Sequence, residues 1–149
     1  MKQKHEQLTA YVLHVRPFRE TSLLVELFTE RLGRCSAVAR GAYRGKSPSR
    51  SLLQCFNFLL VNLQGQGELL TLTHVEYAET PYFLAGDAVV CGLYLNELLY
   101  ATLHRHDPYP ALFQAYHQTL QKLAYHKSAQ MILRQFELIL LEVSFAIQL

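Results

Sequence analysis

Apolar and polar positions alternate with a period of about two over the first eighty or so residues, a pattern that is typical of β-strands. The clearest pair of strands spans residues 21–29 and 34–40, joined by a tight reversal that ends at Gly33. We expect this hairpin to be the centre of the first half of the chain. Three further strands are predicted, at residues 8–16, 55–64 and 68–79.

Five consecutive strands without an intervening helical pattern predict a small closed barrel, and the OB-fold is a five-stranded barrel that often binds nucleic acids. In the fifth strand, Leu70, Leu72 and His74 are expected on one face and Val75 on the other. The side chains expected inside the barrel are Leu23, Val25, Leu27, Phe58, Leu60 and Val61.

After Pro81 the apolar period changes from two to about 3.6, which predicts three antiparallel helices. Their expected starts are Asp87 as an N-cap, Pro110, and Ser128 as an N-cap. The first helical face is traced by Val90, Tyr94, Glu97, Leu98 and Ala101. The second stripe is formed by Leu112, Tyr116, Leu120 and Leu123. The third is formed by Ile132, Phe136, Ile139 and Val143.

These patterns predict an α+β protein with two parts, an OB-fold domain at residues 1–80 and a small helical domain at residues 81–149. The connection between them, residues 80–82, is short. We therefore expect the two parts to be packed against each other, with little hinge motion.

The net charge of +2 conceals an uneven distribution. Residues 1–50 carry ten Lys or Arg and four Glu, a net charge of +6, whereas residues 51–149 carry four and eight, a net charge of −4. Residues 31–50 contain six cations and no Asp or Glu. Such a segment next to a predicted OB-fold favours nucleic-acid binding over the alternative, a solvated surface whose charges only maintain solubility.

A nucleic-acid surface needs cations for phosphates and an aromatic ring on which a base can stack. The basic loop 41–50 supplies Tyr43 among its cations. The candidate DNA-contacting residues are Arg19, Arg34, Arg40, Tyr43, Arg44, Lys46 and Arg50.

Other classes of function have weaker support. There is no run of about 18 apolar residues and no secretory signal pattern at the N-terminus, so we expect an intracellular protein without a membrane span. Cys35, Cys55 and Cys91 are far apart and predict neither disulfides nor a zinc site. A metal-dependent enzyme around His104 and His106 stays open as a minor alternative, although no further ligands complete the site.

Several short motifs, in order and over almost the whole chain, resemble the RecO family of bacterial recombination mediators. They are Arg16-Pro17-Phe18-Arg19-Glu20-Thr21-Ser22-Leu23, Leu27-Phe28-Thr29 with Gly33-Arg34, Val38-Ala39-Arg40-Gly41-Ala42, Leu53-Gln54-Cys55-Phe56, Gly65-Gln66-Gly67-Glu68-Leu69, Tyr94-Leu95-Asn96-Glu97-Leu98-Leu99 and Leu133-Arg134-Gln135-Phe136-Glu137-Leu138. One departure is Cys55, which stands where the family commonly has Pro.

The resemblance implies an OB-fold followed by a helical domain, no enzymatic turnover and no cofactor. Family members bind single- and double-stranded DNA, anneal complementary strands and work with RecR. They dock on the acidic C-terminal tail of single-stranded DNA-binding protein so that RecA can be loaded. The implied location is the cytoplasm, at the nucleoid. The rival interpretation is a protein-interaction scaffold whose barrel does not bind DNA directly.

The resemblance also places Arg134 at the contact with that acidic tail, with Leu138 and Leu141 as the apolar walls beside it. An acidic tail that ends in an apolar residue needs a cation next to a hydrophobic surface. Family members continue well beyond the length of this chain, so we expect either a shortened gene product or a shortened relative. Part of the third helix would then lack a cover, and exposed apolar side chains there would promote self-association.

Overall fold

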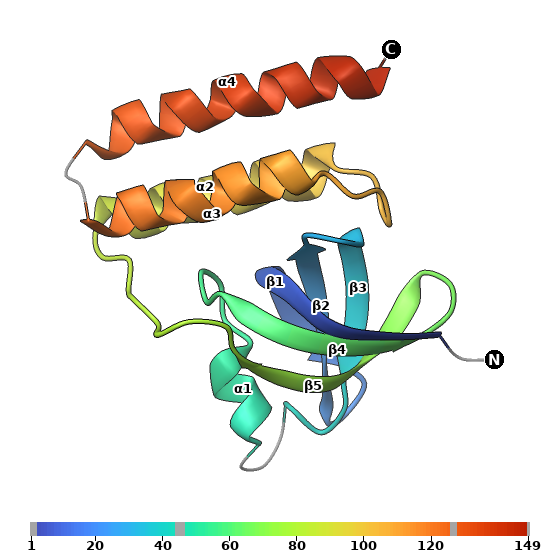
Figure 1. Cartoon of the computed structure of the whole chain (residues 1–149). Helices are drawn as coiled ribbons and strands as arrows, with labels where there is room; N and C mark the ends of the chain where they lie inside the picture. The colour runs from blue at the N-terminus through green and yellow to red at the C-terminus, as the bar shows by residue number, and fades with distance from the viewer. Residues whose placement is uncertain (1–2, 44–46, 126–127, 149) are drawn as a thin grey trace.

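The computed structural model describes residues 3–43, 47–125 and 128–148, which form a five-stranded barrel beneath a layer of helices (Figure 1). The strands are β1 (Gln3–Phe18), β2 (Ser22–Thr29), β3 (Gly33–Ala39), β4 (Leu59–Gly65) and β5 (Leu69–Tyr77). A short helix, α1 (Pro48–Leu52), precedes β4. The helical layer next to the barrel consists of α2 (Asp87–Thr102) and α3 (Pro110–Tyr125), and α4 (Ala129–Gln148) packs on the far side of these two helices.

The five strands close into a barrel in the order β1-β2-β3-β5-β4, which confirms the predicted α+β class and OB-fold. Neighbouring strands are antiparallel except β3 and β5, which pair in parallel through three residues of each strand. The long strand β1 pairs with both β2 and β4. A register shift between Val12 and His14 lets β1 bend far enough to close the barrel.

The interior of the barrel is apolar, and the predicted Leu23, Val25, Leu27 and Val61 are buried there. The assignment of Phe58 and Leu60 to this interior is wrong. Side chains alternate along a strand, and β4 turns Leu59, Val61 and Leu63 inward, so Leu60 is half-buried on the outer side. Phe58 instead faces the helices, with its ring centroid 5.2 Å from that of Tyr11.

The face of β5 that points into the barrel differs between the start and the end of the strand. Leu70 is buried near its start, whereas Val75 is buried near its end and His74 is exposed. The pairing of β4 with β5 shifts register between Asn62 and Leu63, and this irregularity exchanges the two faces. The prediction that His74 shares a face with Leu70 along an uninterrupted strand is therefore wrong.

A second core lies between the barrel and the helices. The predicted stripe of α3 is confirmed, because Leu112, Tyr116, Leu120 and Leu123 are all buried. The face predicted for α2 is wrong, because Val90 and Tyr94 are exposed. The residues of α2 that are buried instead include Ala88, Cys91, Leu95 and Leu99.

The helix starts differ in part from the prediction. Asp87 is the first residue of α2, and Gly86, with a φ of 59°, occupies the cap position. The amide of Ile132 donates to the carbonyl of Ser128, so α4 begins where it was expected. In α4, Ile132 and Phe136 are buried, but Ile139 is 38% exposed, and Leu133 and Leu140 complete the buried face.

Strand β1 takes part in both cores, which joins the barrel to the helices. Ala10 and Val12 point into the barrel, and Tyr11 between them points into the helical layer. The Tyr11 hydroxyl lies 2.5 Å from Nδ1 of His117 on α3. The two parts are therefore packed together, while the division into domains at residue 80 stays a prediction.

Candidate nucleic-acid interface

A groove of about 510 Å³ lies at the end of the barrel, between the β1–β2 loop, the end of β3 and the start of β5. Its walls combine cationic, polar and apolar side chains. They include Phe18, Arg19, Thr21, Val38, Arg40 and Leu69. OB-folds bind oligonucleotides along strands β2 and β3, between the β1–β2 loop and the β4–β5 loop. The groove therefore occupies the position in which this fold binds nucleic acids.

The two cations of the groove come from short, tightly curved segments. Arg19 begins the β1–β2 loop with a φ of 58°, a left-handed conformation that is uncommon outside glycine, and its guanidinium lies 5.1 Å from the centroid of the Phe18 ring. Arg40 directly follows β3. Both side chains are exposed, and among the described residues neither has a carboxylate within 4.0 Å. Both guanidinium groups are thus available to an anionic ligand.

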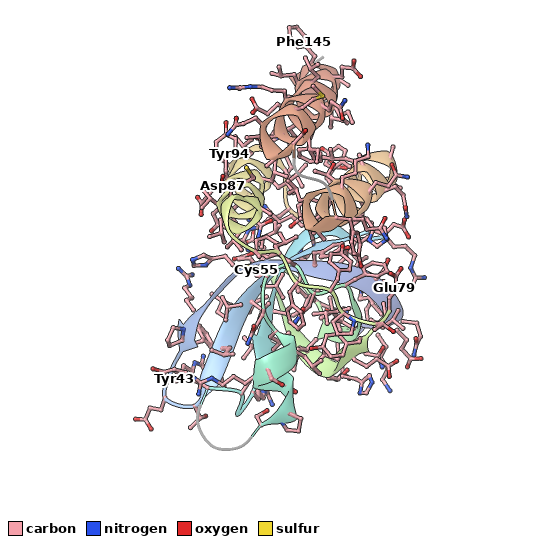
Figure 2. The ribbon with its side chains drawn as sticks, turned by 90° about the vertical axis from the view of Figure 1, so that its left-hand side faces the viewer. Tyr43, Cys55, Glu79, Asp87, Tyr94 and Phe145 are labelled. Carbon is pink, nitrogen blue, oxygen red and sulfur yellow. The ribbon has the colours of Figure 1, made fainter. Side chains whose placement is uncertain are left out.

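Two further predicted residues join this end of the barrel. The amide of Tyr43 donates to the carbonyl of Thr21 over 2.9 Å, which ties the segment after β3 to the β1–β2 loop. Arg50 donates from Nη1 to the Tyr43 carbonyl over 2.8 Å and lies 5.6 Å from the centroid of its ring. Figure 2 shows Tyr43 at the end of the barrel that is remote from the helices. The structure thus gathers Arg19, Arg40, Tyr43 and Arg50 in one region.

Arg34 does not belong to this group, and its assignment to the same surface is corrected. It lies six residues before Arg40 on the outer face of β3, about 20 Å away along the strand. Its Nε donates to the carbonyl of Leu103 over 3.1 Å, and its side chain is only 13% exposed. The connection between α2 and α3 covers Arg34 and leaves Arg40 open. The predicted Arg44 and Lys46 lie outside the described residues.

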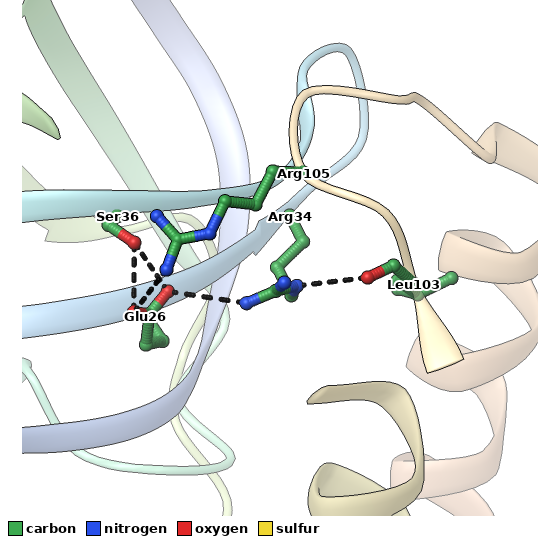
Figure 3. Close-up of polar contacts among 5 residues, drawn as sticks. All are labelled: Glu26, Arg34, Ser36, Leu103 and Arg105. Atoms are coloured by element: carbon green, nitrogen blue, oxygen red, sulfur yellow. Dashed lines mark hydrogen bonds and ion pairs between the residues drawn. The ribbon is translucent and has the colours of Figure 1, made fainter. Parts of the chain in front are cut away.

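The partner of Arg34 is a buried carboxylate, that of Glu26 on β2 (Figure 3). The hydroxyl of Ser36, directly opposite on β3, donates to both carboxylate oxygens, over 2.8 and 2.7 Å. Nη2 of Arg105, from the α2–α3 connection, lies 3.6 Å from the same carboxylate. Glu26 therefore links the barrel to the helical layer, a role that the sequence analysis missed. The detectable signal was a single carboxylate in the middle of an apolar strand.

The other candidate sites are weaker. Among the described residues, no group of three or more His, Cys, Asp or Glu could hold a metal ion, and the three cysteines are free. His106 lies in the α2–α3 connection, where its amide donates to the carbonyl of Arg34. Within the described ranges, no helix is long and apolar enough to cross a membrane.

The residues predicted to contact an acidic tail share one exposed face of α4. Arg134, Leu138 and Leu141 are spaced by four and three residues, which places them on one side of a helix. Leu138 is 63% exposed and Leu141 is 57% exposed. Nη1 of Arg134 lies 3.4 Å from a carboxylate oxygen of Glu137, one turn along. This pair is exposed on the Arg134 side, so solvent screens its attraction.

Comparison with known proteins gives a consistent result. Residues 1–81 match the family described as "Recombination protein O N terminal", and residues 84–144 match "Recombination protein O C terminal". The chain is 46% identical over 149 residues to a DNA repair protein RecO from Nitrosospira multiformis and 44% identical over 150 residues to one from Azoarcus sp.. These alignments cover 99% and 100% of this chain but 62% of each relative. The chain thus spans about three fifths of the length of these relatives.

Proposed function

Because the chain belongs to the RecO family, we propose that it acts in recombinational DNA repair as a non-enzymatic protein that binds DNA and anneals complementary strands. The observation that carries this proposal is the groove between Arg19 and Arg40 at the oligonucleotide-binding position of an OB-fold. Annealing makes and breaks no covalent bond, so it needs no nucleophile or general base. It needs a surface that lowers the repulsion between two anionic strands.

The described residues support a simple mechanism. The exposed guanidiniums of Arg19 and Arg40 neutralise phosphates on one strand and release the counterions condensed on it. The ring of Phe18 lines the same groove and offers a face on which a base can stack. A strand held through its backbone keeps other base edges free for a complementary strand. The protein accordingly favours pairing without reading the sequence.

The proposed partners follow from the family. We propose that the chain works with RecR, that it docks on the acidic C-terminal tail of single-stranded DNA-binding protein, and that it thereby helps to load RecA. The exposed face of α4 with Arg134, Leu138 and Leu141 supports the second of these contacts, because it sets a cation beside apolar side chains. The proposed location is the cytoplasm, at the nucleoid.

One observation favours the rival function, a scaffold that does not bind DNA directly. Arg34 is engaged with Glu26, and Arg50 with Tyr43, so part of the cationic surface predicted from the sequence is occupied within the protein. A scaffold would tolerate this loss, whereas an annealing protein must rely on the remaining cations. The two functions therefore differ in how strongly affinity for DNA depends on salt.

The test is a titration of a fluorescent single-stranded oligonucleotide at several salt concentrations. We expect log K to fall steeply with log salt, and the Arg19→Ala, Arg40→Ala double variant to lower that slope by about 1.4, which is about 0.7 for each phosphate contact. The matched control is Lys122→Ala, Arg134→Ala, which removes the same charge from exposed positions on the helices. No binding by the parent protein, or an equal loss of slope in both double variants, would contradict the proposal.

A further inference from the structure

A second pocket, of about 480 Å³, lies between the barrel and α2. Its walls come from β1, from the segment before β4 and from α2. The residues that matter most are Leu13, Val15, Leu53, Cys55, Leu93 and Asn96. In Figure 2, Cys55 marks the junction of the barrel with the helices, with Asp87 and Tyr94 of α2 above it. The walls are mainly apolar, which suits an inserted hydrophobic side chain.

Asn96 is the uncharged polar side chain of α2 that lines this pocket. The residue is 2% exposed, and its Oδ1 accepts a hydrogen bond from the Tyr116 hydroxyl. Its Nδ2 is buried and closed to solvent. Burial raises the pKa of the Cys55 thiol, and the Asn96 side chain opposes part of that shift, so the amide faces this thiol. The Asn96 amide therefore forms the closed, polar inner end of the pocket.

The outer face of α2 continues the apolar surface beyond the pocket. Val90 is 67% exposed, Leu93 is 47% exposed and Tyr94 is 44% exposed, while the opposite face of the helix is buried. Leu93 belongs both to this face and to the pocket wall. An uncovered apolar surface that leads into a pocket is the arrangement found where protein segments dock.

The charges of the site indicate what kind of segment fits. Glu97 lines the pocket, Asp87 lies at the start of the same helix, and α2 contains no Lys or Arg. Besides Glu97, the wall contains two other titratable side chains, His14 and Cys55. A nucleic acid or an acidic peptide would be repelled by the Glu97 carboxylate, whereas a cationic side chain beside it would be attracted.

We propose that the pocket beneath α2 binds an extended segment of a partner protein that carries an apolar side chain next to a Lys or Arg. The apolar side chain enters between Leu53 and Leu93, and the cation pairs with Glu97. Tyr43, whose amide is bonded to Thr21 beside the proposed nucleic-acid groove, lies at the opposite end of the barrel (Figure 2). DNA and the segment can therefore be bound together. The proposal does not depend on the groove.

The test uses a library of random heptapeptides displayed on phage and selected on the full chain. We expect the selected peptides to share an apolar residue beside a Lys or Arg. A synthetic peptide with the consensus sequence should bind at least tenfold more weakly to Glu97→Lys and to Leu93→Glu, whose positions are exposed, so neither substitution disturbs the core. The matched control is Glu142→Lys, which makes the same charge change at an exposed position of α4. Its affinity for the consensus peptide should lie within twofold of that of the parent.

A second measurement locates the bound peptide. Cys55 is half-buried, while Cys35 and Cys91 are buried, so N-ethylmaleimide should modify Cys55 first, and a saturating peptide should slow that reaction at least tenfold. A library without binders, an acidic consensus, or equal affinity of Glu97→Lys and the parent would overturn the proposal. A dimer of the parent that dissociates in Leu93→Glu would also overturn it, because a second copy of the chain would then cover this face.

Discussion

Nη1 of Arg34 lies 3.8 Å from a carboxylate oxygen of Glu26, and the two side chains are only 13% and 4% exposed. Arg105 approaches the other oxygen of the same carboxylate from the α2–α3 connection. One buried anion on the barrel thus faces two cations, of which one comes from the helical layer. The attraction within such a buried ionic group adds little to the free energy of unfolding. Removal of the anion lowers that free energy strongly, because it leaves the cations without a counter-charge.

Glu26→Gln tests this relationship. The amide keeps the shape of the side chain and an acceptor for Ser36, but it leaves both guanidiniums without a counter-charge. We expect the free energy of unfolding in urea to fall by about 3–5 kcal/mol. Glu142→Gln, at an exposed position, should change it by less than about 0.5 kcal/mol. Equal stability of the two variants would mean that Arg34 and Arg105 find other partners.

Leu27 and Leu60 form a matched pair for testing the faces of the barrel strands. Leu27 is completely buried, so Leu27→Ala should destabilise the protein by about 2–5 kcal/mol. Leu60 is half-buried on the outer side of β4, and Leu60→Ala should cost less than about 1.5 kcal/mol because less apolar area is lost. Both values come from urea unfolding at one pH. The reverse order would show that the register of β4 is displaced by one residue.

Features that depend on local chemistry could be predicted from the sequence. The β2–β3 hairpin was placed within one residue at each end, because alternation and a glycine at positive φ fix a tight turn locally. The stripe of α3 was also correct, since its apolar residues recur on one side only. Recognition of the motif series gave the family, which the comparisons confirm.

Features that depend on distant partners could not be predicted. Helix α2 is apolar on nearly every side, so its periodicity does not indicate which face is buried. In the structure Leu95 and Leu99 are buried, whereas Tyr94 is exposed. Counting charges groups Arg34 with the other cations because its partners, the Glu26 carboxylate and the carbonyl of Leu103, lie in other parts of the chain. The grouping of Arg19 with Arg40 at one groove also depends on strand pairing, which charge counting does not supply.

Cys35 predicts a loss of stability at alkaline pH. Burial, with a smaller contribution from Glu26, raises the pKa of its thiol from 9.0 to about 12. The thiol therefore ionises more easily in the unfolded chain, so its contribution to stability is complete below pH 9 and is lost as the pH rises toward 12. Above pH 9 the free energy of unfolding should fall more steeply for the parent than for Cys35→Ala, by about 1.4 kcal/mol per pH unit.

The control for this prediction is the comparison itself, between the pH dependence of the free energy of unfolding of the parent and that of Cys35→Ala. Burial also raises the pKa of Tyr11 and of Tyr116, but both proteins contain these phenols, so their contributions cancel in the difference. The cavity left by Cys35→Ala shifts the whole curve without changing its slope. Parallel curves between pH 8 and pH 11 would contradict the assignment.

Arg134 provides the last prediction, which concerns the proposed contact with an acidic tail. Its side chain is 70% exposed, and Leu138 and Leu141 lie on the same face of α4, so a peptide with a run of Asp, an apolar end and a free carboxylate can meet both a cation and apolar side chains. Arg134→Glu reverses the charge at the centre of this face. We expect it to weaken binding of such a synthetic peptide at least tenfold, measured by fluorescence anisotropy, while affinity for a single-stranded oligonucleotide changes less than twofold.

The matched control is Lys122→Glu, because Lys122 is exposed on α3 and lines a groove of about 250 Å³ between α3 and α4. This groove also sets a cation beside apolar residues, among them Ile132 and Phe136, and so it is the alternative binding position for the tail. Both variants change the net charge of the chain by −2, so a non-specific electrostatic effect would weaken peptide binding equally in the two. Loss of affinity only in Arg134→Glu supports the outer face of α4. Loss only in Lys122→Glu would place the tail between the helices instead.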